Sequence, residues 1–422
     1  MKYHFKCCKC GHVISNFADW FGHKQFCPVC GGRHVEAVYL ADYSKLKELM
    51  KQQAVNFWHY FDFLPLSDKA NIVTFDEGAV ALEEWPFLSR YAADNYGINC
   101  RVFAYRNDRN GGTNTLKDVS ASMTASVLKE NGGNQYCMSS TGNSATAYAR
   151  YLSKAGIRFT NFAPAIINEA TINEIRAYGQ EVVVSDGDYA QAKKEATRFS
   201  EKSGALISIG NIDPLRIEAK RTMAFEFIRQ LGKLPDVYMQ AVAGGTGPIA
   251  LDKGVRELKE HWPEIAGSPG VAGSSEIAAA PAAIQCPRML LVQQDLCDPM
   301  VQAYEKAKKE GFPEGYENDY PVIENPPTSV FILSAGNPGM YPIVAKIVHQ
   351  SNGDFIRVGE AGLVDFARIV RDEKNIHIGM AATVCFAGFY QALREGSIHD
   401  GETVVVNIGE SGRRYPDFVN SL

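Results

Sequence analysis

The thirty residues 135–164, QYCMSSTGNSATAYARYLSKAGIRFTNFAP, contain two short strand-like runs on either side of a helix-length segment. The runs QYCMSS and RFTNFAP flank an amphipathic segment at 144–155, and a loop of small residues, SSTGN, precedes that helix. A strand, a helix and a second strand at this spacing predict parallel strands joined by a crossover helix. This unit decides the fold, because the same alternation continues along most of the chain.

The alternation of strand-like and helix-like segments runs from Arg101 to the C-terminal region. A helix follows RFTNFAP and extends through Tyr178, and another follows EVVVSDG and extends through Ser203. Further strand-like segments follow in the order ALISIGN, DVYMQAV, RMLLVQQ, FILSAG, DFIRVGE and TVVVNIG. The pattern predicts parallel sheets that helices cover on both faces, with ligand sites in the loops after the carboxyl ends of the strands. Because these strands outnumber those of one ordinary sheet, we expect two α/β lobes.

Composition shifts predict how the chain is divided. Residues 1–40 are expected to form a cysteine-rich ribbon, and residues 41–100 to form linking helices and the start of the large lobe. The segment YSKLKELMKQQAVNFWHYFD is expected to be one such helix. Residues 101–422 are expected to form the two α/β lobes, the smaller at about 115–210. The stretch 266–284, rich in Gly, Ser, Ala and Pro, predicts a surface loop.

The bulk composition excludes several classes of protein. The 422 residues are 45% hydrophobic and 22% charged, which is typical of a globular protein and excludes wholesale disorder, collagen and coiled coil. A net charge of −5 gives no electrostatic reason to expect nucleic acid or an anionic membrane as the partner. The first residues lack the apolar run of a signal peptide, and no window resembles a transmembrane helix, so we expect a cytoplasmic protein.

Five of the ten cysteines lie within the first thirty residues. Two Cys-x2-Cys pairs separated by sixteen residues fit two knuckles around one tetrahedral zinc ion. The predicted ligands are Cys7, Cys10, Cys27 and Cys30. Four thiolates leave no open coordination position, so the metal is expected to be structural. Cys8, His12 or His23 could take a place in this set, and the alternative is that the thiols are buried or redox-active.

Four loops could carry chemistry. The stretch GTNTLKD at 112–118 puts one lysine, Lys117, among small hydroxyl and amide residues. The loop SSTGN starts a helix, and so does Ala243-Gly244-Gly245-Thr246-Gly247, where backbone N–H groups can approach an anion. This glycine loop is neither a Walker loop nor a dinucleotide loop. Taken alone, such a loop is a tight turn about as often as it is an anion site. The fourth loop, NIGESGRRYPDF, follows the last strand.

These loops together resemble the pyridoxal-phosphate enzymes of the tryptophan synthase β-subunit class, fold type II, and among them most closely the threonine synthases. GTNTLKD resembles the family's cofactor-lysine motif Thr-Gly-Ser-Phe-Lys-Asp, SSTGN its asparagine loop, and AGGTGPIA its phosphate loop. NIDPLRIEAKRTMAFEFIRQLGKLPD resembles the segment with Asn-Pro-x-Arg-x-x-Gly-x-Lys-Thr, and FILSAGNP resembles Ile-Gly-Asn-Pro. The resemblance extends from about Thr74 to Asp417 and implies a two-lobed enzyme with pyridoxal 5'-phosphate as its cofactor.

The resemblance assigns the cofactor site. It implies that Lys117 forms the internal aldimine and later moves the substrate's α-proton. Asn143 would bind the phenolic oxygen of the ring, and the segment from Ala243 through Gly244, Gly245 and Thr246 to Gly247 would bind the cofactor phosphate. At the pyridine nitrogen, alignment with cysteine synthases selects Ser411, whereas alignment with threonine synthases selects Gly409. We prefer Ser411, since glycine has no side chain to offer the nitrogen.

The substrate side is implied in the same way. Arg216 stands where the family places an arginine that binds the phosphate of a phospho-amino acid, which suits a bidentate donor. Its alternative is a surface charge on a helix. Contacts to the substrate carboxylate or second phosphate are expected from Thr113, Asn114, Ser140 and Thr141.

Some family positions differ in this chain. GAVAL at Gly78 to Leu82 stands in place of the family's GNTPL, and Asp213 replaces the asparagine before proline. Gly379-Met380 replaces a Glu-Pro pair before the helix AATVCFAGFY. These are substrate-side or structural positions, so the reaction class is better defined than the substrate.

The expected activity is elimination or replacement at Cβ or Cγ of an O-phospho-amino acid, as in threonine synthase. The alternatives are a cysteate synthase-like replacement of the phosphate of phosphoserine by sulfite, suggested by DVYMQAVAGGTGPI and RMLLVQQDLCDPM, and an inactive binding protein of the same fold. The net negative charge of the chain disfavours a zinc ribbon that binds nucleic acid. Relatives are commonly dimers, so a homodimer without nucleic-acid or membrane partners is expected.

Overall fold

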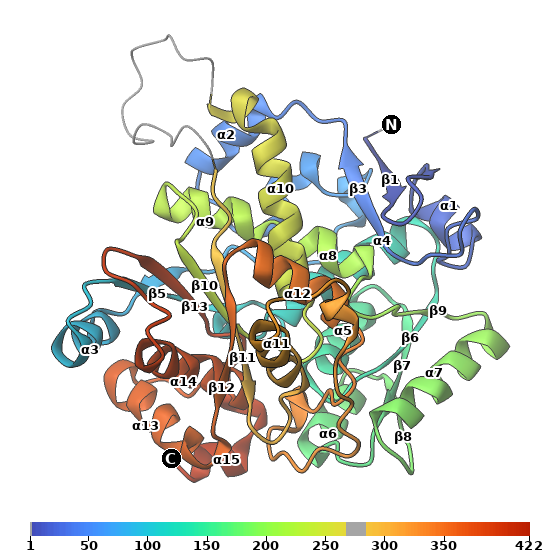
Figure 1. Ribbon diagram of the computed structural model, residues 1–422. Helices are drawn as coiled ribbons and strands as arrows, with labels where there is room; N and C mark the ends of the chain where they lie inside the picture. The colour runs from blue at the N-terminus through green and yellow to red at the C-terminus, as the bar shows by residue number, and fades with distance from the viewer. Residues whose placement is uncertain (1, 267–283) are drawn as a thin grey trace. The chain divides into compact units, whose positions relative to one another are not determined.

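The computed structural model describes residues 2–266 and 284–422 (Figure 1). The chain forms two compact units, each assembled from separate segments. Unit 1 contains Met1–Ala79, Asn110–Gly232 and Ala250–Ile284. Unit 2 contains Val80–Arg109, Lys233–Ile249 and Gln285–Leu422. The expected loop at 266–284 lies almost entirely outside the described residues.

Unit 1 contains a four-stranded parallel sheet in the order β8-β7-β6-β9. Its strands are β6 (Gln135–Ser139), β7 (Arg158–Ala163), β8 (Glu181–Val184) and β9 (Leu206–Ile207). The helices between and beside them are α4 (Lys117–Glu130), α5 (Asn143–Lys154), α6 (Glu169–Ala177), α7 (Tyr189–Ser203), α8 (Pro214–Lys220) and α9 (Met223–Leu231).

Alternation along β6 explains why helices cover both faces of this sheet. Tyr136 and Met138 point into a core shared with α4 and α5, while Cys137 between them packs with Ala192 and Ala196 of α7 on the opposite face. Successive side chains of a strand point to opposite faces, so an apolar run such as YCM can bury both.

The N-terminal part of unit 1 is a small antiparallel sheet. Its strands are β1 (Tyr3–Cys7), β2 (Val13–Ile14) and β3 (Val35–Tyr39), in the order β2-β1-β3, with α1 (Phe17–Gly22) beside them. Aromatic packing supplies its core, because Phe5, Phe17 and Trp20 are almost completely buried and Phe5 stacks edge-on against Phe17.

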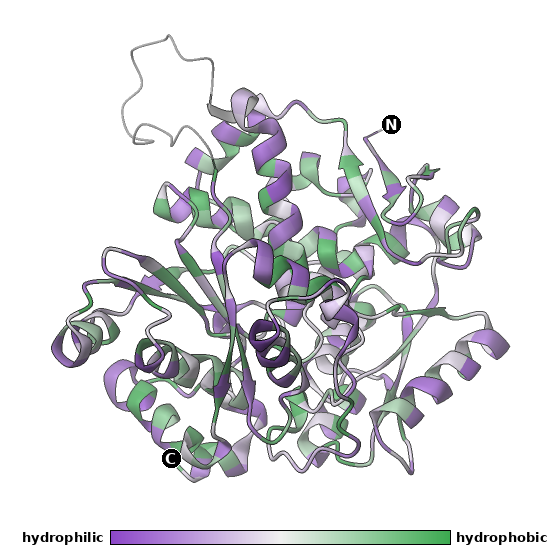
Figure 2. Cartoon of the chain, viewed as in Figure 1, coloured by the Kyte–Doolittle hydropathy of each residue, from purple (hydrophilic) through white to green (hydrophobic). Residues whose placement is uncertain are grey.

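Unit 2 contains a six-stranded sheet in the order β12-β11-β10-β13-β5-β4. Its strands are β4 (Leu82–Glu84), β5 (Arg101–Tyr105), β10 (Val237–Ala241), β11 (Arg288–Gln294), β12 (Asp354–Val358) and β13 (Thr403–Asn407). All neighbours are parallel except the edge strand β4, which pairs antiparallel with β5. Figure 2 colours the central strands as hydrophobic, as expected for strands buried on both faces.

Helices also cover both faces of the sheet in unit 2. On one face lie α3 (Pro86–Tyr96), α13 (Leu363–Lys374) and α14 (Met380–Arg394), whose apolar residues share one core with the strands. On the other face lie α11 (Pro299–Lys309) and α12 (Tyr341–Gln350), where Tyr304 and Tyr341 pack on Phe355 of β12. The short α15 (Pro416–Asn420) follows β13, and α10 (Thr246–Ala266) starts in unit 2 and continues into unit 1.

Two local expectations are wrong. The linking segment is not one helix: α2 (Ser44–Lys51) ends at Lys51, and a 3-10 helix follows at Phe57–Phe63. The break is stabilised by Asn56, which is extended and accepts a hydrogen bond from the Trp58 N–H at 3.1 Å.

The segment FILSAG is not a strand, because Phe331–Leu333 forms a 3-10 turn instead. The Ser334 hydroxyl donates to the Phe331 carbonyl at 2.6 Å and stabilises this turn. No helix among the described residues combines the length and apolar character needed to cross a lipid bilayer.

Candidate functional site

Lys117 is the first residue of α4, and hydrogen bonds to Asp118 order the loop that precedes it. Asp118 Oδ1 accepts hydrogen bonds from the Thr113 N–H at 2.9 Å and hydroxyl at 2.6 Å, and its Oδ2 accepts one from the Thr115 N–H at 2.9 Å. The Lys117 N–H donates to the Thr115 hydroxyl at 3.1 Å. Lys117 is half-buried, unlike a solvated surface lysine. The buried Thr113 therefore orders the lysine loop through Asp118.

Two residues of this loop need left-handed backbone. Gly112 has a φ of 77°, and a Cβ on it would lie 2.6 Å from the Tyr151 hydroxyl. Asn114 has a φ of 58°, which asparagine tolerates better than most residues. Its side-chain amide donates to the Asn110 carbonyl at 3.1 Å. The Gly-Thr-Asn sequence thus fits the turn that ends at Lys117.

The SSTGN loop joins β6 to α5 in the same unit. Ser140 Oγ accepts from the N–H groups of Gly142 and Ala145, both at 3.3 Å, so Ser140 caps the helix start. Asn143 is the first residue of α5 and is half-buried, as is Thr141. Because α4 and α5 pack against each other, the structure brings the lysine helix and the asparagine helix together within unit 1.

Arg216 lies on α8 of the same unit and is half-buried. Its Nη2 donates to the Ser208 hydroxyl at 2.7 Å, and its guanidinium lies 5.5 Å from the centre of the Tyr148 ring on α5. Burial acts against the charge, but the phenol groups of Tyr148 and Tyr136 and the carboxyl group of Asp213 raise the pKa of Arg216. Its buried Nε has no hydrogen-bond partner in the part of the chain that the structure describes.

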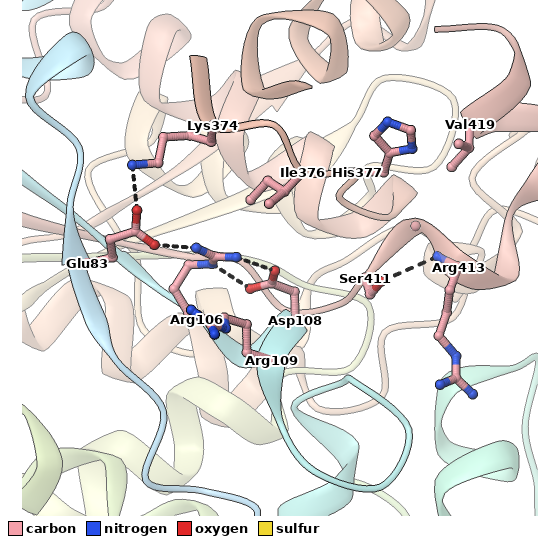
Figure 3. A pocket seen from close by; sticks show the side chains of 11 residues that line it. Glu83, Arg106, Asp108, Arg109, Lys374, Ile376, His377, Ser411, Arg413 and Val419 are labelled. Atoms are coloured by element: carbon pink, nitrogen blue, oxygen red, sulfur yellow. Dashed lines mark hydrogen bonds and ion pairs between the residues drawn. The ribbon is translucent and has the colours of Figure 1, made fainter. Parts of the chain in front are cut away.

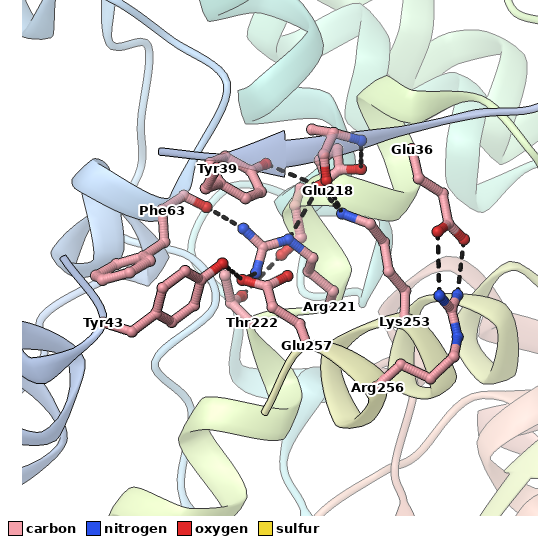
Figure 4. Close-up of polar contacts among 12 residues, drawn as sticks. Glu36, Tyr39, Tyr43, Phe63, Glu218, Arg221, Thr222, Lys253, Arg256 and Glu257 are labelled. Atoms are coloured by element: carbon pink, nitrogen blue, oxygen red, sulfur yellow. Dashed lines mark hydrogen bonds and ion pairs between the residues drawn. The ribbon is translucent and has the colours of Figure 1, made fainter. Parts of the chain in front are cut away.

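The opposite face of α8 carries a buried charge cluster (Figure 4). Glu218 accepts from the Ala37 N–H at 2.8 Å, the Tyr39 hydroxyl at 2.7 Å, Lys253 Nζ at 2.5 Å and Arg221 Nε at 2.9 Å. Burial alone would raise the pKa of Glu218, but Lys253 and Arg221 outweigh it and hold the pKa below its ordinary value. These bonds attach β3 of the N-terminal sheet to α8 and α10.

Lys220, which the sequence analysis did not select, is almost completely buried on α8 at 4% exposure. Burial first, then the charges of Lys117 and Arg216, hold the pKa of Lys220 well below its ordinary value. The sequence signal was its position four residues after Arg216, which places both on one face of a helix.

The glycine loop lies in unit 2, between β10 and α10. Gly245 has a φ of 87°, and a Cβ on it would lie 2.4 Å from Val344 Cγ2. A Cβ on Gly247 would lie 2.0 Å from Gln240 Oε1. Ala243 and Gly244 are half-exposed, Thr246 is buried, and the first turn of α10 carries no acidic residue. A helix start of this kind suits a phosphate group, so the loop fits its expected role.

Ser411 follows β13 in unit 2 and lines a cavity of about 760 Å³ within that unit (Figure 3). Its Oγ accepts from the Arg413 N–H at 3.4 Å. Two other residues of the lining form an ion pair, since Arg106 donates to both oxygens of Asp108 at 2.8 Å. Gly409, the alternative neighbour of the pyridine nitrogen, is half-buried, and a Cβ on it would contact only the Asn407 amide, at 3.7 Å.

Gly379-Met380 stands where the family has a Glu-Pro pair, and in this chain Glu410 supplies a carboxylate at that place. Its Oε1 accepts from the Ala381 N–H at 2.8 Å at the start of α14, and its Oε2 accepts from the Tyr415 hydroxyl at 3.0 Å. A Cβ on Gly379 would lie 2.5 Å from Glu410 Cγ. The glycine at position 379 therefore leaves room for the Glu410 carboxylate, which comes from a different loop.

The four predicted metal ligands come together in the N-terminal sheet. Their sulfur atoms all lie within 4.8 Å of one another, with the Cys7–Cys30 and Cys10–Cys27 pairs at 3.6 Å. Tetrahedral zinc with bonds of about 2.3 Å needs sulfur atoms about 3.8 Å apart, so the set fits a zinc ion. Each knuckle closes with a glycine of positive φ, because the Gly11 N–H donates to the Cys7 carbonyl at 2.8 Å and the Gly31 N–H to the Cys27 carbonyl at 2.9 Å.

Comparison with known proteins identifies the family of the chain. The family described as pyridoxal-phosphate dependent enzyme matches residues 73–410, which contain Lys117, Asn143 and the glycine loop but not Ser411. The threonine synthase of Methanocaldococcus jannaschii is 23% identical over 92% of this chain and 88% of its own length. The threonine synthase of Synechocystis is 26% identical over 85% and 82%.

A solved cysteine synthase from Entamoeba histolytica superposes with a TM-score of 0.60 at 17% identity, covering 82% of this chain and 89% of that one. This likeness shows the fold alone, and it confirms the predicted α/β fold type II. The family match confirms the predicted dependence on pyridoxal phosphate. The chain belongs to the pyridoxal-phosphate-dependent enzyme family and is an enzyme of that kind, a lyase.

Proposed function

We propose that this enzyme eliminates or replaces the phosphate at Cβ or Cγ of an O-phospho-amino acid, and that its substrate is O-phosphohomoserine, which it converts to threonine and phosphate. The curated relatives named threonine synthase support this proposal, because the similarity extends over most of both chains. The motifs around Lys117 and Arg216, which resemble those of threonine synthases, are part of the same similarity.

The observation that carries the proposal is the state of Arg216. Its guanidinium is cationic, is oriented by the hydrogen bond to Ser208, and retains a buried Nε donor with no partner among the described residues. A buried donor without a partner costs free energy unless a ligand satisfies it. An anion such as a phosphate monoester meets that need, and a guanidinium binds it with good geometry.

The chain's own residues divide the work. When bound, pyridoxal phosphate supplies an electron sink that acidifies the hydrogen on the substrate's Cα. Lys117 Nζ holds the cofactor between turnovers and then takes and returns the Cα proton. The backbone N–H groups of Ala243 to Gly247 would bind the cofactor phosphate, and Asn143 would bind the ring's phenolic oxygen. The Ser411 hydroxyl would hydrogen-bond to the pyridine nitrogen without holding it protonated.

We also propose that the four cysteines hold a structural zinc ion, on the strength of the sulfur–sulfur distances. A site with four protein ligands has no position left for a substrate, so the ion acts on folding alone. The hydrogen bonds from β3 to Glu218 attach this N-terminal sheet to α8.

The test is phosphate release by the purified holoenzyme with phosphohomoserine, compared with phosphoserine in the presence and absence of sulfite. Threonine and phosphate in equal amounts from phosphohomoserine is the expected result. Sulfite-dependent release from phosphoserine alone would instead support the cysteate synthase-like alternative. If the holoenzyme releases phosphate from neither, the proposed substrate class is wrong.

A further inference from the structure

Helix α8 has two faces with different charge environments. Glu218 and Arg221 lie three residues apart on one face and are paired within the cluster of Figure 4. Arg216 and Lys220 lie four residues apart, which places them together on another face of the helix. The first pair is satisfied within the protein, whereas the second has no ion-pair partner among the described residues.

Lys220 is buried without a counter-ion. Its side chain is 4% exposed, and no hydrogen bond or ion pair to it exists in the described ranges 2–266 and 284–422. The charged groups that act on it are Lys117, at the start of the adjoining α4, and Arg216, one turn away. Both are basic side chains, and no carboxylate among the described residues pairs with this lysine.

An uncompensated pair of basic side chains is unfavourable for the fold. Like charges four residues apart destabilise a helix, and burial increases the penalty. By contrast, Lys253 and Arg221, equally buried on the other side, share Glu218. Arg216 also keeps its buried Nε without a partner. Two neighbouring basic groups with unused donors suit an anionic ligand better than they suit the empty protein.

We propose that Lys220 is a specificity-determining residue that joins Arg216 in binding the phosphate group of the phospho-amino acid. This inference rests on the proposed function and names the second basic residue of its phosphate subsite. A phosphate monoester carries close to two negative charges at neutral pH, and a bound anion favours the protonated form of a nearby lysine, so Arg216 and Lys220 together match it, whereas a carboxylate is matched by one cation. Arginine supplies the planar fork and lysine the compact charge with rotatable donors.

The experiment compares Lys220→Met with wild-type holoenzyme. The matched control is Lys202→Met, which removes the same charge from an exposed position on α7. Binding of inorganic phosphate is measured by isothermal titration calorimetry, so that turnover is not needed. We expect about 10- to 100-fold weaker phosphate binding in Lys220→Met, the effect of losing a charged hydrogen bond, and no change in the control.

Two further readouts separate binding from structure. Without phosphate, Lys220→Met should melt at or above the wild-type temperature, because no protein partner is lost. With phosphate, the wild type should gain more thermal stability than the variant. Lys220→Arg, which keeps the charge, should retain most of the phosphate affinity.

Unchanged phosphate binding in Lys220→Met would overturn the inference, and so would a large fall in melting temperature without phosphate, since Lys220 would then be structural. Equal weakening of phosphate and of the unphosphorylated amino acid would also overturn it. An enzyme that turns over no phospho-amino acid but binds phosphate through Lys220 would refute the proposed function and leave the anion subsite in place.

Discussion

Replacing Gly245 by alanine should weaken binding of pyridoxal phosphate, because the glycine loop has no room for a side chain. The added Cβ would lie 2.4 Å from Val344 Cγ2, whereas carbon atoms in contact stay about 3.5–4.0 Å apart. Overpacking of this kind costs about 1–3 kcal/mol. The φ of 87° at this position adds about 1–2 kcal/mol for any residue with a Cβ.

The two terms together destabilise the loop conformation that presents the N–H groups by about 2–5 kcal/mol. If that conformation is needed only for the cofactor, the dissociation constant should rise by roughly 30-fold to several thousandfold, at about 1.4 kcal/mol per factor of ten. The assay is titration of cofactor-free enzyme with pyridoxal phosphate, followed by the visible absorbance of the lysine-bound cofactor.

A second substitution separates the two costs. Val344→Ala removes the methyl groups that collide, so Gly245→Ala/Val344→Ala should regain the steric part and remain roughly 5- to 30-fold weaker than Val344→Ala alone. Gly396→Ala is the matched control, since Gly396 has a φ of 69° and nothing within 4 Å of an added Cβ. It should lower stability slightly and leave cofactor affinity unchanged. Cofactor affinity within threefold of wild type in Gly245→Ala would refute this reasoning.

Three further predictions concern the other parts of the molecule. Lys117→Ala should lose the visible cofactor band and the cofactor retained after borohydride reduction, while keeping its circular dichroism spectrum; a retained band would show that another amine binds the cofactor. Cys27→Ser should reduce zinc from about one ion per chain to none by elemental analysis and should expose the N-terminal sheet to proteolysis, and intact zinc content would contradict the four-thiolate site. Because folding lowers the pKa of Glu218, ionised Glu218 stabilises the folded protein fully above the ordinary glutamate pKa, and this stabilisation is lost as the pH falls through the folded-state pKa. Glu218→Gln should therefore flatten the decline of melting temperature below about pH 4.5. Substitution of the exposed Glu48 in Glu48→Gln should not.

The strand–helix alternation was predictable because each unit of it is local. In the segment 135–164, a continuous apolar strand and an amphipathic helix are encoded within thirty residues, and the four-stranded and six-stranded sheets repeat this pattern. The two expectations that failed lie where local pattern is overridden. Phe57–Phe63 contains five buried aromatic residues, so helical periodicity did not describe it. FILSAG turns because the Ser334 hydroxyl donates to the Phe331 carbonyl.

The candidate site divides in the same way. Lys117, Asn143 and the glycine loop stand at the starts of helices in contiguous motifs, so the sequence alone could select them. Asp118, Lys220 and Glu410 were missed, since their importance lies in contacts with residues of other loops or helices. Arg216 was selected by motif, but its unpartnered Nε became visible only once Ser208 and Tyr148 were placed around it.

By itself, the sequence determined the alternating architecture, the spacing of the four cysteines, and the glycine and lysine loops, because these depend on residues within a few positions of one another. The tertiary structure alone decided which charges are compensated. Glu218 and Lys220 are two residues apart on one short helix, yet the first accepts from four donors on β3, on α10 and just after α8, whereas the charged neighbours of the second are two basic side chains. Whether a buried charge is stabilised or left for a ligand depends on what distant segments place beside it, and no local pattern encodes that.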